Sequence, residues 1–248
     1  MPETSIVASS NSDREYTLAG PATLEGTSLH TGQKVTLTIK PAPEGHGFKF
    51  RRIDLPDKPF IDADVGRVEK VERATTLASG SVRVHTVEHV LSALTGMNVD
   101  NALIEMDANE PPIGDGSARP FVDLIRKAGV EEQDSRRKTW EIREPIHFDD
   151  KDGSHITIVP YRGFRVSVTN LSHLGKFTQY FSSEVTPELY ESEIAPARTF
   201  TFYEDIKPLL DQGLIKGGSL ENAVVIRDEE ILPKEPMRFE NEFARHKA

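Results

Sequence analysis

The sequence predicts an α+β protein built from two similar sheet-and-helix domains. Short runs such as Val35–Ile39 alternate apolar and polar residues, as a half-buried strand does. Two longer runs, starting near Val87 and Ala118, place apolar residues at helical spacing instead. A pattern of strand, proline-led turn, Gly-Phe and strand occurs at Leu37–Phe50 and again at Ile156–Val166. Any two hairpins share this outline, but taken as an internal repeat it indicates two related domains.

Composition limits the possible functions. The chain has 248 residues, enough for one large domain or two of roughly 100–150 residues. Its formal charge of −10 argues against general nucleic-acid binding, although a local basic pocket could still bind an anionic substrate. Without cysteine, any metal must be held by His, Asp or Glu. No segment is typical of a signal peptide or a membrane span, so we expect a cytoplasmic protein with no stable membrane insertion.

The first domain is expected over residues 17–129, after a disordered lead of residues 1–16 that is rich in polar residues. Strand patterns occur from Leu18 onward and at Val35–Ile39, Phe48–Phe50, Ser81–Val84 and Asn101–Met106. The first helix has an apolar stripe made of Val87, Val90, Leu91 and Leu94, with Thr86 as its expected N-cap. The second helix is predicted over Ala118–Ala128, and Gly129 ends it.

The second domain is expected over residues 139–248, after a charged linker of residues 130–138. Its strands begin at Trp140, and a short helix follows at Tyr203–Gln212. Ala223–Ile226 is typical of a buried strand. The last helix is expected to begin near Phe239 and to continue at Ala248. A helix rarely ends uncapped after so few turns, so we expect this domain to be incomplete.

His85-Thr-Val-Glu-His89 offers two interpretations. It matches His-x-x-Glu-His, in which two histidines on one helical face bind zinc and the Glu is the base. The strand pattern of Ser81–Val84 and the N-cap at Thr86 place His85 before the helix, which favours Glu88 and His89 as the working pair. Glu88 would take a proton from a water activated by zinc. Alternatively, Glu88 only stabilises the helix N-terminus and His89 is a surface residue.

Other candidate residues have ordinary explanations when each is considered alone. His246 lies near a helix C-terminus, Lys247 is a solvated charge, His30 lies in a turn-rich loop, Asp115 is a turn former, and Phe200 and Phe202 are typical of a core. A metallopeptidase that uses His85 and a non-catalytic carbohydrate- or nucleotide-binding protein therefore stay open at this point.

Several long motifs, taken together, resemble one family. They are Ser28–Gly32, Thr86–Leu94, Asp100-Asn101, Pro112–Ala118, Ala197–Phe200, Gly217–Ala223 and Arg238–Lys247. In their order along the chain and in their residues they resemble the UDP-3-O-acyl-N-acetylglucosamine deacetylase family, the zinc enzymes of the committed step of lipid A biosynthesis. The resemblance covers Leu18 to Ala248. It implies two β-α-α-β domains that form a sandwich with the helices inside, a βαβ insert in the second domain, and an active site between the domains.

The resemblance also implies residue roles. His89 and His246 match the family's zinc-binding histidines, and Glu88 matches its general base. Thr199 matches a threonine that stabilises the oxyanion, and Lys247 matches a lysine that meets the anionic substrate. The substrate-binding residues that it implies are Leu29 and His30 on a first-domain loop, and Phe200, Phe202, Ile206, Gly218, Ser219 and Ala223 on the insert that forms the passage for the acyl chain.

Three departures from the family pattern bear on activity. The family's third zinc ligand is an aspartate four residues after the second histidine, and that position would lie beyond Ala248. A later histidine, the family's general acid, is also absent. His85 stands where the family usually has a small polar residue, so it is not expected to bind zinc. A catalytically incompetent fragment that only binds substrate is therefore an alternative. Some relatives carry a hydroxyacyl dehydratase, so a fused or separate dehydratase is a possible partner.

Overall fold

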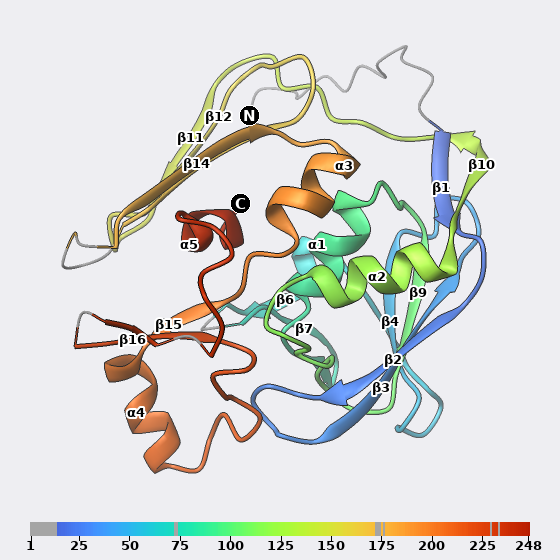
Figure 1. Ribbon diagram of the computed structural model, residues 1–248. Helices are drawn as coiled ribbons and strands as arrows, with labels where there is room; N and C mark the ends of the chain where they lie inside the picture. The colour runs from blue at the N-terminus through green and yellow to red at the C-terminus, as the bar shows by residue number, and fades with distance from the viewer. Residues whose placement is uncertain (1–13, 72–73, 172–174, 176, 229, 233) are drawn as a thin grey trace.

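A computed structural model describes residues 14–71, 74–171, 175, 177–228, 230–232 and 234–248 (Figure 1). The first half is organised by a five-stranded sheet. In spatial order its strands are β2 (Ala22–Thr27), β3 (Lys34–Pro41), β9 (Ala102–Met106), β4 (Phe48–Arg52) and β5 (Phe60–Asp62). Neighbouring strands are antiparallel except β4 and β9, which are parallel. The sheet therefore contains a mixed pairing around its central strand.

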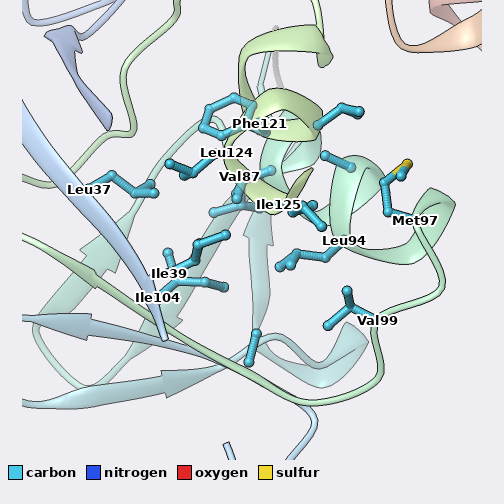
Figure 2. Packing of buried hydrophobic residues seen from close by; sticks show 14 of the residues in the cluster. Leu37, Ile39, Val87, Leu94, Met97, Val99, Ile104, Phe121, Leu124 and Ile125 are labelled. Carbon is cyan, nitrogen blue, oxygen red and sulfur yellow. The ribbon is translucent and has the colours of Figure 1, made fainter. Parts of the chain in front are cut away.

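Two helices cover one face of this sheet. They are α1 (Glu88–Gly96) and α2 (Arg119–Ala128), which pack on each other, and α2 also packs on β2. The alternation in β3 places Leu37 and Ile39 inward, where they meet Ile104 of β9 and Phe121 of α2 in the main core (Figure 2). Gly129 ends α2 with a positive φ of 75°, as the sequence predicts.

Smaller sheets flank the main one. A single turn of 3-10 helix at Val65–Arg67 precedes a three-stranded sheet. Its strands are β6 (Val68–Lys70), β7 (Thr76–Ser79) and β8 (Val82–Val84), and β7 lies in the middle and pairs with both others. β1 (Arg14–Leu18) pairs antiparallel with β10 (Val130–Arg136).

The pairing of β1 with β10 corrects two predictions. The expected linker is a strand over most of its length, and the last residues of the expected disordered lead belong to β1; residues 1–13 lie outside the described part of the chain. β10 is rich in charge because it is largely exposed, and polar side chains meet along the ladder, such as Tyr16 and Glu132 at 2.9 Å. Backbone pairing needs no apolar side chains, so the charge pattern gave no sign of the strand.

The second half contains two hairpins and an inserted unit. β11 (Ile146–Asp149) pairs with β12 (His155–Ile158), and β13 (Arg165–Asn170) pairs with β14 (Gln179–Glu184). Strand structure thus begins at Ile146 rather than at Trp140. After α3 (Pro187–Leu189) comes a π-helical turn, Tyr190–Ile194. β15 (Phe200–Phe202), α4 (Tyr203–Asp211) and β16 (Val224–Arg227) form the expected βαβ unit, with β15 parallel to β16, and β17 (Glu230–Leu232) adds the third strand.

The repeated sequence pattern does not mark a hairpin in either half. β9 lies between β3 and β4 in the first half. In the second half, no strand within the described residues lies between β12 and β13. The apolar side chains of the β11–β12 pair are exposed, namely Ile146, Phe148, Ile156 and Ile158. The mixed α+β class is confirmed, whereas the division into two similar domains, residues 17–129 and 139–248, stays a prediction.

Two helix boundaries differ from the predictions. Val87, not Thr86, precedes α1, and Thr86 has a positive φ of 54° with its hydroxyl directed to Glu110 instead of to the helix. α5 covers Glu242–His246 and begins three residues later than expected. Phe239 forms a turn, because its carbonyl accepts the Glu242 N–H, and the carboxylate of Glu242 binds the Arg238 N–H. No helix in the described part of the chain is long and apolar enough to cross a bilayer.

The contact of Gly96 with Tyr190 generates a stability prediction. A methyl group added at Gly96 would overlap the ring of buried Tyr190, which also hydrogen-bonds Ser92 at 2.8 Å. Alanine is the better helix former, yet we expect Gly96→Ala to lower the free energy of unfolding by about 1–3 kcal/mol through overpacking. Urea denaturation measures this. Gly20→Ala is the matched control, because an added methyl there meets only one atom, at 3.9 Å, and should change stability little.

Candidate functional site

A cavity lies where α1 of the first half meets α5 of the second. It has a volume of about 210 Å³ and is lined by Glu88, His89, Ser92, Ala118, Tyr190, Ile194, Ala197, His246 and Ala248. The imidazole rings of His89 and His246 meet edge-on, with their centroids 5.3 Å apart and an interplanar angle of 78°. The fold therefore brings together two histidines that are far apart in the sequence, with Glu88 beside them.

The position of His246 depends on a buried ion pair. The side chains of Arg198 and Glu242 are 5% and 0% exposed, and the Arg198 Nε donates to Glu242 Oε1 at 2.8 Å. The same carboxylate accepts the backbone N–H groups of Arg198 and Arg238 at 2.9 and 2.8 Å. Burial acts to raise the pKa of Glu242, but the bonds from Arg198 and Arg238 hold it below its ordinary value. The start of α5 is thus tied to the segment that precedes β15.

The two imidazoles are suited to bind a divalent metal. The Nδ1 of His246 lies 3.0 Å from the Ala197 carbonyl, which can only accept, so Nδ1 carries the proton and Nε2 keeps its lone pair. Burial lowers the pKa of His246 to about 3 and also lowers the pKa of His89, so both rings are neutral. The buried Nδ1 of His89 has no hydrogen-bond partner within the described residues. A neutral imidazole with an unpaired nitrogen fits zinc.

Glu88 is the carboxylate of this cavity. It lies in the first turn of α1, is half-buried, and accepts the Thr75 N–H at 3.0 Å through Oε2. Its position next to His89 places a proton acceptor on the wall of the same cavity. Within the described residues no three His, Asp or Glu side chains form a metal-binding group, so Glu88 is a carboxylate beside the two imidazoles and not a third metal ligand.

Thr199 and Lys247 belong to the second half of the chain, and neither lines the cavity. The Thr199 N–H donates to the Gly116 carbonyl at 2.7 Å, and its own carbonyl accepts the Val224 N–H, which joins the glycine-rich turn to the insert. Lys247 is exposed, with its ammonium 5.6 Å from the centroid of the Phe200 ring. Phe200 in turn stacks on buried Phe243 of α5, with the ring centroids 4.4 Å apart. The Lys247 ammonium thus lies next to the stacked rings of Phe200 and Phe243, at the start of the insert.

The loop that carries Leu29 and His30 contacts the insert directly. The carbonyl groups of Leu29 and His30 accept the N–H groups of Gly217 and Lys216 at 3.0 and 3.2 Å. A side chain at Gly217 would overlap the Ser28 carbonyl, so glycine is needed for this close approach. Beyond Gly218, the Ser219 N–H donates to Asn222 and the Ser219 carbonyl accepts the Ala223 N–H. The structure therefore brings the two predicted substrate-binding segments together.

The predicted apolar residues of the insert lie on two neighbouring elements. Phe200 and Phe202 belong to β15, where they are paired in register with Val224 and Ile226. The Phe202 ring lies 6.4 Å from that of Phe177, and Ile206 is half-buried in α4. Phe200 and Phe202 pack on the small core around Val224 and Ile226, and neither they nor Ile206 line the cavity of His89 and His246.

Comparison with known proteins shows the family of this chain. Residues 15–248 match the family model described as LpxC, UDP-3-O-acyl N-acetylglycosamine deacetylase. The chain belongs to this family. A UDP-3-O-acyl-N-acetylglucosamine deacetylase of Myxococcus xanthus is 43% identical over 96% of this chain and 76% of its own length. Proteins of the same name from Citrifermentans bemidjiense and Pseudomonas entomophila are 40% and 42% identical over 94% of this chain, and over 76% and 78% of their own lengths.

In this member of the deacetylase family, His85 takes no part in the cavity. It precedes α1, its N–H donates to the Asn109 carbonyl, and its Nδ1 hydrogen-bonds the Thr76 hydroxyl at 2.9 Å. The His-x-x-Glu-His interpretation requires two histidines on one helical face. The structure does not provide that geometry.

Two carboxylates near the site were missed as functional candidates. Asp115 was expected only to form a turn, but it also pairs with Arg238 of the second half at 2.7 Å. Glu110 is fully buried and binds His30 and Thr86. The Gly-Asp-Gly-Ser sequence signalled the turn but not its distant partner, and no local pattern marked Glu110.

Glu242 gives a prediction for this site. Replacing it with alanine leaves the Arg198 guanidinium buried without its partner, so we expect Glu242→Ala to lower the free energy of unfolding by about 3–5 kcal/mol. Because the pKa of Glu242 is lowered on folding, its contribution is complete above the ordinary value of 4.5 and is lost as the pH falls below it. Denaturation at pH 7 and pH 3 measures both effects. The exposed neighbour Glu240 is the control, and an equal loss in Glu240→Ala would contradict the assignment.

Proposed function

We propose that this chain hydrolyses the 2-acetamido group of UDP-3-O-(3-hydroxyacyl)-N-acetylglucosamine and releases acetate, the committed step of lipid A biosynthesis. One observation carries the proposal. Two neutral imidazoles, His89 and His246, meet beside Glu88 in a single cavity, although they lie far apart in a chain that belongs to the deacetylase family.

His89 and His246 would hold zinc, which when bound acts as a Lewis acid and lowers the pKa of water. Glu88 accepts a proton from the attacking water, because its carboxylate lines the same cavity as the two rings. The Thr199 side chain donates a hydrogen bond to the oxygen on which negative charge develops. Lys247 contributes positive charge at the exposed rim of the site. Acid-base chemistry and charge stabilisation therefore come from both halves of the chain.

The substrate is bound by the two segments that meet at Gly217. Phe200, Phe202 and Ile206 offer apolar surface to the 3-hydroxyacyl chain, and the turn from Gly218 to Ala223 shapes that passage. Leu29 and His30 contact the sugar from the first half. A nucleotide-linked substrate is consistent with a cytoplasmic location, and a hydroxyacyl dehydratase stays a predicted partner.

Metal binding and turnover test this assignment. We expect His89→Ala and His246→Ala each to weaken zinc binding at least tenfold in calorimetric titration, because each removes one of two imidazole donors. Glu88→Ala should retain zinc but lose about 10²–10⁴-fold in deacetylation, the usual contribution of a general base. Mass spectrometry of the UDP-sugar product measures turnover.

His85→Ala is the control, because His85 lies outside the cavity. It should bind zinc as the parent chain does. If His85→Ala lost zinc while His246→Ala kept it, the metallopeptidase interpretation would replace ours. A chain that contained no zinc by elemental analysis, and bound the UDP-sugar equally well after Glu88→Ala, would indicate a non-catalytic binding protein.

A specific observation supports a second candidate, a chain that binds the substrate without turning it over. No group of three metal-ligating side chains forms within the described residues, so the histidine pair has no third ligand there. We therefore expect the 248-residue chain to bind zinc weakly and to turn over slowly. Extending it beyond Ala248 with the corresponding residues of the Myxococcus xanthus relative should increase zinc affinity and kcat together. Equal activity of the short and extended forms would show that the 248 residues suffice.

A further inference from the structure

Glu110 is a buried carboxylate at the junction of two parts of the proposed site. Glu110 is 0% exposed and lies in the segment between β9 and α2. Oε1 lies 2.7 Å from the Nδ1 of His30 and accepts the Thr86 hydroxyl at 2.7 Å. Oε2 accepts the backbone N–H groups of His30 and Thr31 at 3.0 and 3.3 Å. One carboxylate therefore binds both the loop that carries Leu29 and His30, which we call the substrate loop, and Thr86, which lies just before α1.

Thr86 needs such a partner. It is β-branched and has a φ of 54°, a strained left-handed conformation that is kept only where surrounding contacts enforce it. The hydroxyl bond to Glu110 is one such contact. A second acts on the preceding residue, because the His85 N–H donates to the Asn109 carbonyl at 2.8 Å. Two successive residues, Asn109 and Glu110, thus hold the strained entry to the helix that begins with Glu88.

The substrate loop is held by the same residue. The Ser28 hydroxyl donates to the Glu110 carbonyl at 3.0 Å, while the side chain of Glu110 binds the loop at His30. The far side of that loop contacts the insert through Lys216 and Gly217. Because the carboxylate only accepts hydrogen bonds, it requires the proton of a neutral His30 ring to reside on Nδ1. Nε2 is then left as an acceptor.

We infer that Glu110 is a positioning residue for the proposed site: its carboxylate fixes the Nδ1–H tautomer of His30 and joins the Leu29–His30 loop to Thr86 at the start of α1. The inference rests on the proposed substrate role of His30. It assigns to Glu110 no contact with the reacting atoms. Charged hydrogen bonds inside a protein are strong and directional, which suits this orienting role.

The decisive variant is Glu110→Gln, which keeps the shape of the side chain but can accept through only one of its terminal atoms. Its amide N–H₂ can donate to His30 and so permits the opposite tautomer. Nitrogen-15 NMR of the imidazole rings, in zinc-free protein at a pH where His30 is neutral, should show the Nδ1–H form in the parent chain. In Glu110→Gln it should show a mixture or the Nε2–H form.

Substrate binding supplies the second measurement. Calorimetry with the UDP-sugar and zinc-free protein avoids turnover. We expect His30→Ala and Glu110→Gln each to raise Kd by about tenfold, and the double variant to raise it no further, because residues that act through one contact are not additive. Glu105→Gln is the matched control. It removes a carboxylate from β9 that pairs with Lys40 and Arg51, and it should leave Kd within about twofold of the parent.

Three outcomes would overturn the inference. An unchanged His30 tautomer and Kd in Glu110→Gln, with weaker binding in His30→Ala, would exclude Glu110 and leave the proposed site intact. Additive effects in the double variant would show that Glu110 does not act through His30. An unchanged Kd in His30→Ala would reject the substrate role of His30 together with this inference. If Glu110→Gln failed to fold, Glu110→Asp would serve in the binding measurement: its carboxylate is one methylene shorter, so we expect Kd to rise, and an unchanged Kd would overturn the inference.

Discussion

The arrangement of the site depends on the buried ion pair between Arg198 and Glu242. α5 has only five residues, too few for a helix to be stable by its own hydrogen bonds. The carboxylate of Glu242 holds the start of this helix by accepting from Arg198 and from the Arg238 backbone. The ion pair thus fixes the start of the helix beside His89, while the His246 bond to the Ala197 carbonyl and the pairing of Arg245 with Glu193 hold its end.

Each half uses a buried carboxylate to hold the start of the helix that carries its histidine. Glu242 does so for α5, and Glu110 does so for α1 through strained Thr86. Both carboxylates also reach across the chain, Glu242 to the segment before β15 and Glu110 to the loop at His30. The histidine pair and the substrate-binding loop are therefore positioned by polar contacts at helix starts, while the apolar core sets the distance between the elements.

The sequence predicted much of the first half because its signals are local. The alternation of β3, the apolar stripe of α1 and the glycine after α2 all appear where expected. Predictions failed where distant contacts decide the structure. Thr86 bonds Glu110 instead of capping α1, and the charged segment at Val130 pairs with β1 instead of forming a linker. Neither the α1 boundary nor β10 could be read from neighbouring residues.

By itself the sequence determined the family, the α+β class and the residue types available for chemistry, because long motifs and periodicity are properties of neighbouring residues. Only the tertiary structure decided which of those residues meet. It placed His89 beside His246, left His85 against Thr76, and gave Glu110 its partners. The physical reason is that strand pairing and buried ion pairs join segments far apart in the chain, and such contacts leave no periodic pattern in the sequence.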